Sequence, residues 1–248
     1  MGRLTDGIRH LLIINILFFV GTILYGDLFY EWFSLWYPQN PNFSIWQILS
    51  HMFMHGGFMH LFFNMYALWA FGSPLERMWG TRKFLFFYFS AGLGAALIHT
   101  GVNYYTVQQG IDALQAAGVT ESEIFGLLDQ GKYNESWMQV APRGVVDNFL
   151  QSFYTPAVGA SGAIYGILVA FGMMYPNSEL FLIFLPVPIK AKYFIPVLIG
   201  LDLFSGVTGY SLFGSGIAHF AHVGGALFGF IMMWYWKKNQ FDRNRWDL

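Results

Sequence analysis

The feature that most constrains this chain is a series of apolar segments, each about as long as a lipid bilayer is thick. A hydrocarbon core about 30 Å thick needs roughly 20 apolar residues in a helix, and fewer where the helix is short or broken. One water-soluble core cannot bury so many apolar side chains, because 55% of the 248 residues are hydrophobic and only 11% are charged. The sequence therefore predicts an all-α integral membrane protein. Six segments qualify as spans: residues about 10–30, 57–74, 84–101, 157–175, 192–207 and 217–236.

The basic residues sort to one side of this six-span arrangement. All except Lys132 and Arg143 fall in or beside the N-terminal tail, the second and fourth connecting loops, and the C-terminal tail. Basic loops remain on the cytoplasmic side of a membrane, so both termini are predicted to be cytoplasmic. The apolar stretch 180–188, LFLIFLPVP, is too short and too proline-rich to span, and we assign it to the interface or a loop.

The connection between the third and fourth segments, residues 102–156, is long and polar. Thr120 and Glu123 have the spacing of a capping box ahead of the apolar Ile124 and Leu128. The stretch VQQGIDALQAAG, residues 107–118, is expected to form a second short helix. We therefore expect a small, partly helical insertion outside the cytoplasm, within one domain that covers residues 1–248.

Some functional classes are excluded by composition. The chain has no cysteine, so it has neither a disulfide framework nor a thiolate metal site or cysteine nucleophile. Its formal net charge of −1 gives no reason to expect a nucleic-acid partner.

Polar side chains gather at one depth within the predicted spans. His60 and Asn64 lie near the outer end of the second segment, Ser161 lies in the first turn of the fourth, and His222 lies near the start of the sixth. Polar groups in a membrane are costly and usually face a bundle interior or a watery cavity. These three even-numbered segments all enter from the outer side, so the sequence predicts a site that opens to the extracytoplasmic side.

Glycine spacing predicts which helices meet. Small residues four apart allow helix backbones to approach closely. If the glycine-bearing faces of the fourth and sixth segments meet, Ser161 and His222 lie about one turn outside the contact between the two helices. Tyr165 shares a face with Ser161, and its ring can stack on His222. The pairs with this spacing are Gly162 and Gly166 in the fourth segment, and Gly225 and Gly229 in the sixth.

The residue types indicate acyl-transfer chemistry. A serine hydroxyl is a weak nucleophile until a base takes its proton, and histidine titrates in the right range. The oxyanion that forms needs donors, for which the N–H of Ser161 and the side chains of His60 and Asn64 are candidates. We see no carboxylate placed to orient His222, so a Ser–His dyad is expected rather than a triad. Asp202 in the fifth segment is expected to pair with a partner near the outer surface, without a direct catalytic role.

Each of these residues also has a simpler interpretation. Ser161 alone fits a helix-packing serine, and GASGA does not complete the hydrolase motif G-x-S-x-G. Asn64 alone fits a hydrogen bond between helices. A transporter or channel with a polar midplane site is a further alternative, although it would not need a nucleophile beside a base.

A metal site is the remaining alternative for the histidines. The candidate ligands are His51, His55, His60, His219 and His222. The chain has no H-E-x-x-H motif and no carboxylate beside these histidines, so no metal is predicted. His10 and His99 lie near the ends of their segments and are assigned to the membrane surface.

The same stretches resemble the rhomboid family of intramembrane serine proteases. The matching segments are HGGFMHLFFNMYALWAFG, LERMWGTRKFLFFYFSAGLGA, VGASGAIYG, PVPIKAKY and AHVGGALFG. The resemblance implies a six-helix rhomboid bundle with Ser161 as the nucleophile and His222 as the general base. His60 and Asn64 would line the oxyanion hole, which Gly159 helps to shape. His55 would be a further polar residue near the site, and the ring of Tyr165 would stack on the catalytic histidine.

The resemblance also implies partners and location. Substrates would be single-span membrane proteins, cut near the outer edge of their helix, with small residues before the scissile bond. No cofactor would be needed, and the chain would lie in the lipid bilayer of a bacterial inner membrane. An inactive rhomboid-like protein that binds membrane clients is the runner-up. Such proteins lose the serine or the histidine, whereas this chain has both Ser161 and His222.

Overall fold

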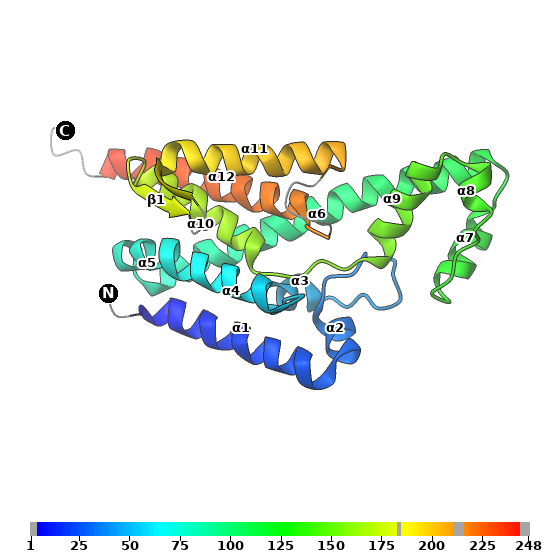
Figure 1. Ribbon diagram of the computed structural model, residues 1–248, viewed down its shortest axis with the longest axis horizontal. Helices are drawn as coiled ribbons and strands as arrows, with labels where there is room; N and C mark the ends of the chain where they lie inside the picture. The colour runs from blue at the N-terminus through cyan, green and yellow to red at the C-terminus, as the bar shows by residue number, and fades with distance from the viewer. Residues whose placement is uncertain (1–3, 183–184, 211–215, 244–248) are drawn as a thin grey trace.

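The computed structural model of the protein describes residues 4–182, 185–210 and 216–243. Within these residues, helical columns run along one bundle, with both chain ends at the same end of it (Figure 1). The all-α membrane bundle predicted from the sequence is confirmed. The columns are α1 (Asp6–Tyr25); the run of α4 (Phe58–Ala67), the π-helical turn η2 (Leu68–Gly72) and α5 (Ser73–Trp79); α6 (Thr81–Ala116); α10 (Ser161–Met174); α11 (Ala191–Thr208); and α12 (His219–Arg243).

Helix α10 lies at the centre of the bundle, packed against α6 and α12. A Cβ atom added to Gly225 would lie 1.8 Å from the carbonyl oxygen of Gly162, and one added to Gly229 would lie 2.6 Å from the Cα of Gly166. The backbones of α10 and α12 therefore touch, and only glycine fits at this contact. This confirms the predicted small-residue packing, which sets how far Ser161 lies from His222.

Helix α6 is longer than the sequence suggested. It runs unbroken for 36 residues, so the expectation of a separate short helix over residues 107–118 is wrong. Val107, Ile111 and Leu114 are buried and recur at helical spacing. These three side chains pack into one cluster with those of α9 (Arg143–Tyr154). This packing lets α6 continue beyond its apolar part.

The insertion is partly helical, as predicted, and has its own apolar core. It contains the end of α6, α7 (Glu121–Leu128), α8 (Trp137–Val140) and α9. Trp137, Phe149 and Phe153 are buried in this core. Thr120 caps α7, since its hydroxyl accepts a hydrogen bond of 3.3 Å from the N–H of Glu123.

Two shorter connections complete the fold. Between α1 and α4 lie α2 (Asp27–Phe33), α3 (Gln47–Ser50) and the 3₁₀ turn η1 (His51–Phe53). Between α10 and α11 lies an antiparallel hairpin of β1 (Glu179–Leu182) and β2 (Leu185–Lys190). The stretch 180–188 thus forms a connection rather than a span, and residues 183–184 within it lie outside the described residues.

A buried carboxylate joins α1 to the rest of the bundle. Glu76 is only 3% exposed. It accepts hydrogen bonds from the N–H groups of Gly7 at 2.6 Å and Ile8 at 2.9 Å, and from the hydroxyls of Thr5 and Thr81. Because the first N–H groups of a helix lack partners within it, this negative charge completes the N-terminus of α1.

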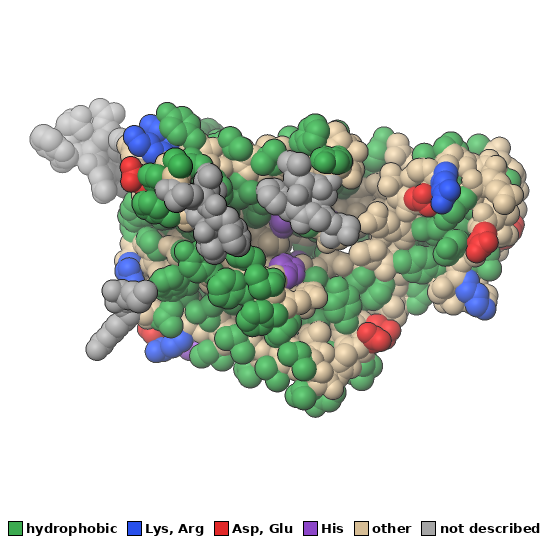
Figure 2. Space-filling view, viewed as in Figure 1, with side chains coloured by type: hydrophobic (Ala, Val, Ile, Leu, Met, Phe, Trp, Pro, Cys, Tyr) green, Lys and Arg blue, Asp and Glu red, His purple; other side chains and the backbone are tan. Residues whose placement is uncertain are grey.

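The outer surface of the bundle is suited to lipid. By length and hydropathy, α1, α6 and α11 can each cross a membrane, and α10 is a shorter apolar helix. Figure 2 shows hydrophobic side chains over the middle of the visible face, with most charged side chains toward its two ends. Exposed apolar side chains on several helices include Leu17, Phe62, Phe86, Val197 and Phe230.

Candidate active site

Ser161 is the first residue of the central helix α10. The chain reaches it through Gly159, whose φ of +123° strongly favours glycine. Two contacts hold this approach in place: the N–H of Gly159 donates to the carbonyl of His51 at 2.9 Å, and Ala157 pairs with Leu35 in an isolated β-bridge. The serine is therefore held on an ordered turn at a helix N-terminus, where its own N–H has no partner within the helix.

The structure brings Ser161 and His222 together, although 61 positions separate them in the chain. The Nε2 atom of His222 lies 2.8 Å from the serine Oγ. The ring of Tyr165 stacks on the imidazole, with centroids 4.2 Å apart and planes inclined by 13°. The predicted stacking is confirmed, and it holds the plane of the imidazole.

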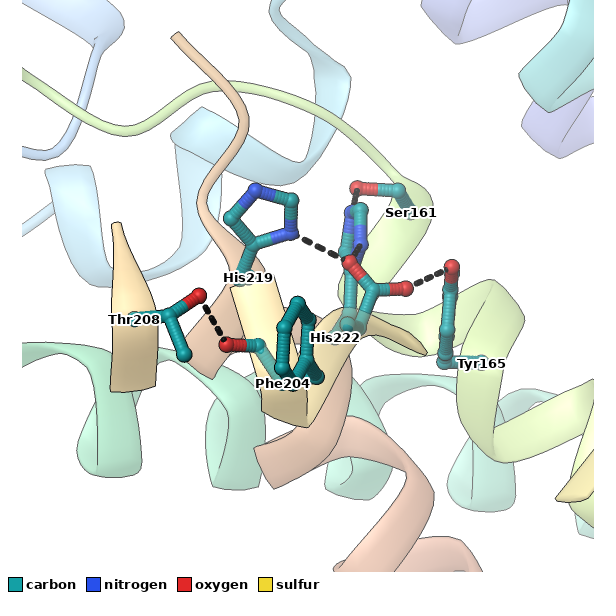
Figure 3. A network of polar contacts seen from close by, with 7 residues as sticks. Ser161, Tyr165, Phe204, Thr208, His219 and His222 are labelled. Atoms are coloured by element: carbon teal, nitrogen blue, oxygen red, sulfur yellow. Dashed lines mark hydrogen bonds and ion pairs between the residues drawn. The ribbon is translucent and has the colours of Figure 1, made fainter. Parts of the chain in front are cut away.

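Asp202 on α11 lies on the other side of His222. Its Oδ1 atom is 3.1 Å from Nδ1 of His222 and 2.6 Å from Nδ1 of His219. Its Oδ2 atom accepts a hydrogen bond from the hydroxyl of Tyr165. Figure 3 shows Ser161, Tyr165, His219 and His222 converging on this network.

Asp202 corrects the expectation that no carboxylate is placed to orient His222. The sequence gives the depth of Asp202 in its segment but not the neighbour of that helix. The structure packs α11 against both α12 and α10, which brings the carboxylate to the histidine. Asp202 was expected to pair with a partner near the outer surface, and in the structure its partners belong to the candidate site itself.

His60 lies beside the approach to Ser161. A Cβ atom on Gly159 would be 2.9 Å from Cε1 and Nε2 of His60, so this ring lies directly against Gly159. Nδ1 of His60 accepts from the N–H of Gly56 at 3.4 Å. With Nδ1 as the acceptor, a neutral ring carries its proton on Nε2, which faces Gly159. His60 can therefore donate a hydrogen bond next to the serine.

Two further predicted residues are buried near His60. The amide Nδ2 of Asn64 is buried without a protein partner among the described residues, as is Nε2 of His55. The ring of His55 meets that of His60 edge-on, with centroids 5.0 Å apart. Burial and the neighbouring His60 lower the pKa of His55 to about 3, so it remains neutral. Asn64 is thus a buried donor without an acceptor, one helical turn after His60.

A cavity beside Ser161 was not predicted from the sequence. Its walls include His51 from η1 and His99 from α6. The other lining residues are mainly small: Gly92, Ala95, Ala96, Gly162 and Ala163. Burial lowers the pKa of His51 to about 4. The available sequence signal was a histidine within an apolar helix, but periodicity does not reveal the face to which it belongs.

One group in the described residues has the composition of a metal site. The ligand atoms of Asp202, His219 and His222 all lie within 4.8 Å of one another. Hydrogen bonds between the two imidazoles and the carboxylate account for this arrangement. His51, His55 and His60 lie outside that group. The absence of a metal therefore stays a prediction, which chelation tests.

Comparison with known proteins identifies the family. The family model of the rhomboid domain matches residues 42–239, well over half of the chain. The protein belongs to the rhomboid family, as the motifs and their spacing suggested.

Similar proteins carry the same family name. The chain is 29% identical over 203 residues to the mitochondrial presenilin-associated rhomboid-like protein of Homo sapiens, covering 81% of this chain and 40% of that protein. It is 24% identical over 191 residues to the mitochondrial rhomboid protein 1 of Saccharomyces cerevisiae, covering 77% and 42%. Over 52 residues it is 40% identical to the rhomboid protease GluP of Bacillus subtilis, covering 21% and 10%. The chain thus spans about two fifths of the length of the first two relatives.

Proposed function

We propose that this protein is an intramembrane serine endopeptidase in which Ser161 is the nucleophile and His222 is the general base. The observation that carries the proposal is the 2.8 Å contact between Ser161 Oγ and His222 Nε2, inside a bundle of membrane helices. A nucleophile and a base within hydrogen-bond reach, with the base oriented by a third group, are the signature of nucleophilic catalysis. The runner-up, a client-binding protein that does not cut, would have no need for this pair.

The proposed reaction follows from the geometry. His222 takes the proton of Ser161 as Oγ attacks the scissile carbonyl carbon, and returns it to the amine that leaves. The oxyanion accepts hydrogen bonds from the N–H of Ser161 and from the side chains of His60 and Asn64. Water then attacks the acyl-serine with His222 again acting as the base, which restores Ser161.

Single-span membrane proteins are the proposed substrates. The site lies among helices with lipid-facing outer surfaces, so a substrate helix can approach it from within the bilayer. Small residues before the scissile bond are supported by the size of the cavity beside Ser161, whose volume is only about 20 Å³. The proposal requires no cofactor.

We place the protein in the inner, cytoplasmic membrane of a bacterium, with both termini cytoplasmic and the site opening to the other side. The distribution of lysine and arginine supports this orientation through the positive-inside rule. The similarity to a Bacillus subtilis protein supports a bacterial membrane, whereas the relatives from Homo sapiens and Saccharomyces cerevisiae are named as mitochondrial.

Purified protein in liposomes with a labelled single-span substrate tests the proposal. The wild type should cut the substrate, form an acyl-serine with a fluorophosphonate probe, and keep its activity in EDTA. Ser161→Ala should abolish both cutting and labelling while leaving thermal stability nearly unchanged, because alanine is favourable in a helix. Cutting by Ser161→Ala at the wild-type rate would refute the assignment of the nucleophile. Loss of activity in EDTA that zinc restores would instead indicate a metal site.

A further inference from the structure

Asp202 is a costly residue for a membrane helix. Its side chain is 4% exposed, in the middle of α11, a helix apolar enough to cross a bilayer. An acidic group at this depth needs partners that compensate for the lost hydration. The structure supplies three donors: the imidazoles of His219 and His222 on Oδ1, and the hydroxyl of Tyr165 on Oδ2.

These contacts determine where the proton of His222 lies. An ionised carboxylate only accepts hydrogen bonds, so Nδ1 of His222, 3.1 Å from Oδ1, must carry a proton. In a neutral imidazole the other nitrogen then has a free lone pair. That nitrogen is Nε2, which lies 2.8 Å from the oxygen of Ser161. The carboxylate therefore selects the tautomer in which His222 can accept the serine proton.

The other contact of His222 cannot select a tautomer. Tyr165 stacks on the imidazole face at 4.2 Å, which holds the plane of the ring but is indifferent to the position of its proton. In the opposite tautomer, Nε2 would carry the proton and would donate to Ser161 instead of accepting from it. Tyr165 contacts both residues, because its ring stacks on His222 and its hydroxyl donates to Asp202. It therefore links the residue that holds the tautomer to the ring whose plane it holds.

We infer that Asp202 is a positioning residue, which fixes the tautomer of His222 and stabilises the imidazolium formed when Ser161 loses its proton. This inference rests on the proposed protease function and deepens it, because it adds Asp202 to the Ser161–His222 pair as a third contacting residue. One carboxylate oxygen has two lone pairs, so His219 can share Oδ1 with His222 without displacing it.

Asp202→Asn is the most direct test, measured with the liposome assay. An amide can donate to Nδ1 and so favour the wrong tautomer, and we expect kcat to fall about 10²–10⁴-fold with little change in KM. The pH profile adds a readout that a purely structural role would not move. Groups that face His222 are His60 from α4, His99 from α6, Tyr165 from α10, Asp202 from α11 and His219 on its own helix. Removing the one carboxylate in this set should move the low-pH limb of kcat/KM about one pH unit or more toward acid.

Further variants separate positioning from folding. Asp202→Glu keeps the carboxylate and should return the low-pH limb toward its wild-type position, even if kcat stays reduced. Ser205→Ala removes another buried polar side chain from α11 and should behave as the wild type. In a His222→Ala background, Asp202→Asn should cost little more, because residues that act as a unit are non-additive.

The outcomes distinguish this inference from the proposed function. If Ser161→Ala cuts as fast as the wild type, the protease proposal fails and the inference falls with it. If Ser161→Ala is inactive but folded Asp202→Asn keeps wild-type kcat and an unmoved pH profile, the function stands and the role of Asp202 is refuted. An equal additional loss from Asp202→Asn with and without His222 would also refute it, because Asp202 would then act independently of His222.

Discussion

At the scale of single residues, the candidate site depends on which atoms donate and which accept. His222 presents a lone pair to Ser161, whereas His60 presents an N–H toward Gly159. Two histidines in the same site are thus held in opposite tautomers by different partners. A base and an oxyanion donor require opposite protonation at the nitrogen that faces the reacting atoms.

The proposed oxyanion role of His60 and Asn64 gives a kinetic prediction. Their hydrogen bonds should strengthen as charge develops in the transition state, so Asn64→Ala should lower kcat with KM nearly unchanged, and His60→Ala should do so more strongly. Removing one such donor typically costs about 10²–10³ in kcat. Both variants should still label slowly with a serine-directed probe, since Ser161 and His222 remain. A change that falls mainly on KM would make either residue a substrate contact instead.

Much of the site at residue scale could be predicted from the sequence. Polar side chains in an apolar segment have few structural explanations, so Ser161 and His222 stood out at matching depths. Asp202 was recognised as a membrane-embedded acid, but its partner was not. Its position along α11 follows from the sequence, whereas contact with His222 depends on packing between helices, which hydrophobic periodicity does not report.

At the scale of elements, contact between the backbones of α10 and α12 sets the spacing of the reacting pair. Gly225→Ala should therefore lower both stability and activity, because its Cβ would overlap the carbonyl oxygen of Gly162. Overpacking of this kind costs about 1–3 kcal/mol or more, since backbone cannot move aside as a side chain can. Gly200→Ala in α11 is the matched control. A Cβ there meets nothing within 4 Å, so stability should stay equal or rise by up to about 1 kcal/mol. Equal effects of the two changes on thermal unfolding would contradict this account.

Glu76 gives a second prediction at this scale. Glu76→Gln removes the charge and replaces one carboxylate oxygen by an amide NH₂, so that the N–H of either Gly7 or Ile8 loses its acceptor. A buried donor without an acceptor costs about 1–3 kcal/mol, so the midpoint of thermal unfolding should fall. Glu121→Gln, in the exposed first turn of α7, is the comparison and should cost less than about 1 kcal/mol. The interpretation of Glu76 as the joint between α1 and the bundle would be wrong if both changes had the same small effect.

The boundaries of elements were harder to predict than their existence. The sequence placed the end of the third span where polar residues begin, at about residue 101. The helix continues to Ala116 because Val107, Ile111 and Leu114 find a new apolar partner in α9. Where the neighbour of a helix changes from lipid to protein, the polarity of its sequence changes but the helix continues.

At the scale of the whole molecule, neutral buried histidines link stability to pH. Burial lowers the pKa of His51 to about 4 and that of His55 to about 3, against about 6.5 in an unfolded chain. Between these values the unfolded state binds more protons than the folded state. The contribution of these histidines to the free energy of unfolding is therefore complete above about pH 6.5 and is lost as the pH falls toward 4.

Thermal unfolding at several pH values checks this dependence. Each histidine should lower the free energy of unfolding by about 1.5 kcal/mol between pH 6.5 and pH 5, because the unfolded imidazole is already half protonated at pH 6.5 and the full slope is about 1.4 kcal/mol per pH unit. His51→Asn should unfold with a weaker dependence on pH in this window than the wild type. Identical slopes for the two proteins would mean that His51 is charged in the folded state or neutral in both states.

The continuous helix α6 has one more consequence. At a rise of 1.5 Å per residue its 36 residues extend about 54 Å, well beyond a hydrocarbon core of about 30 Å. The same rigid rod lines the cavity beside Ser161 through Gly92 and Ala95, and carries α9 near its far end. The insertion is therefore attached to the bundle through a continuous helix, which limits its movement. Any macromolecule that docks on the insertion is held at a constant distance and orientation relative to Ser161. Its distance along α6 would then decide which peptide bonds can reach Ser161.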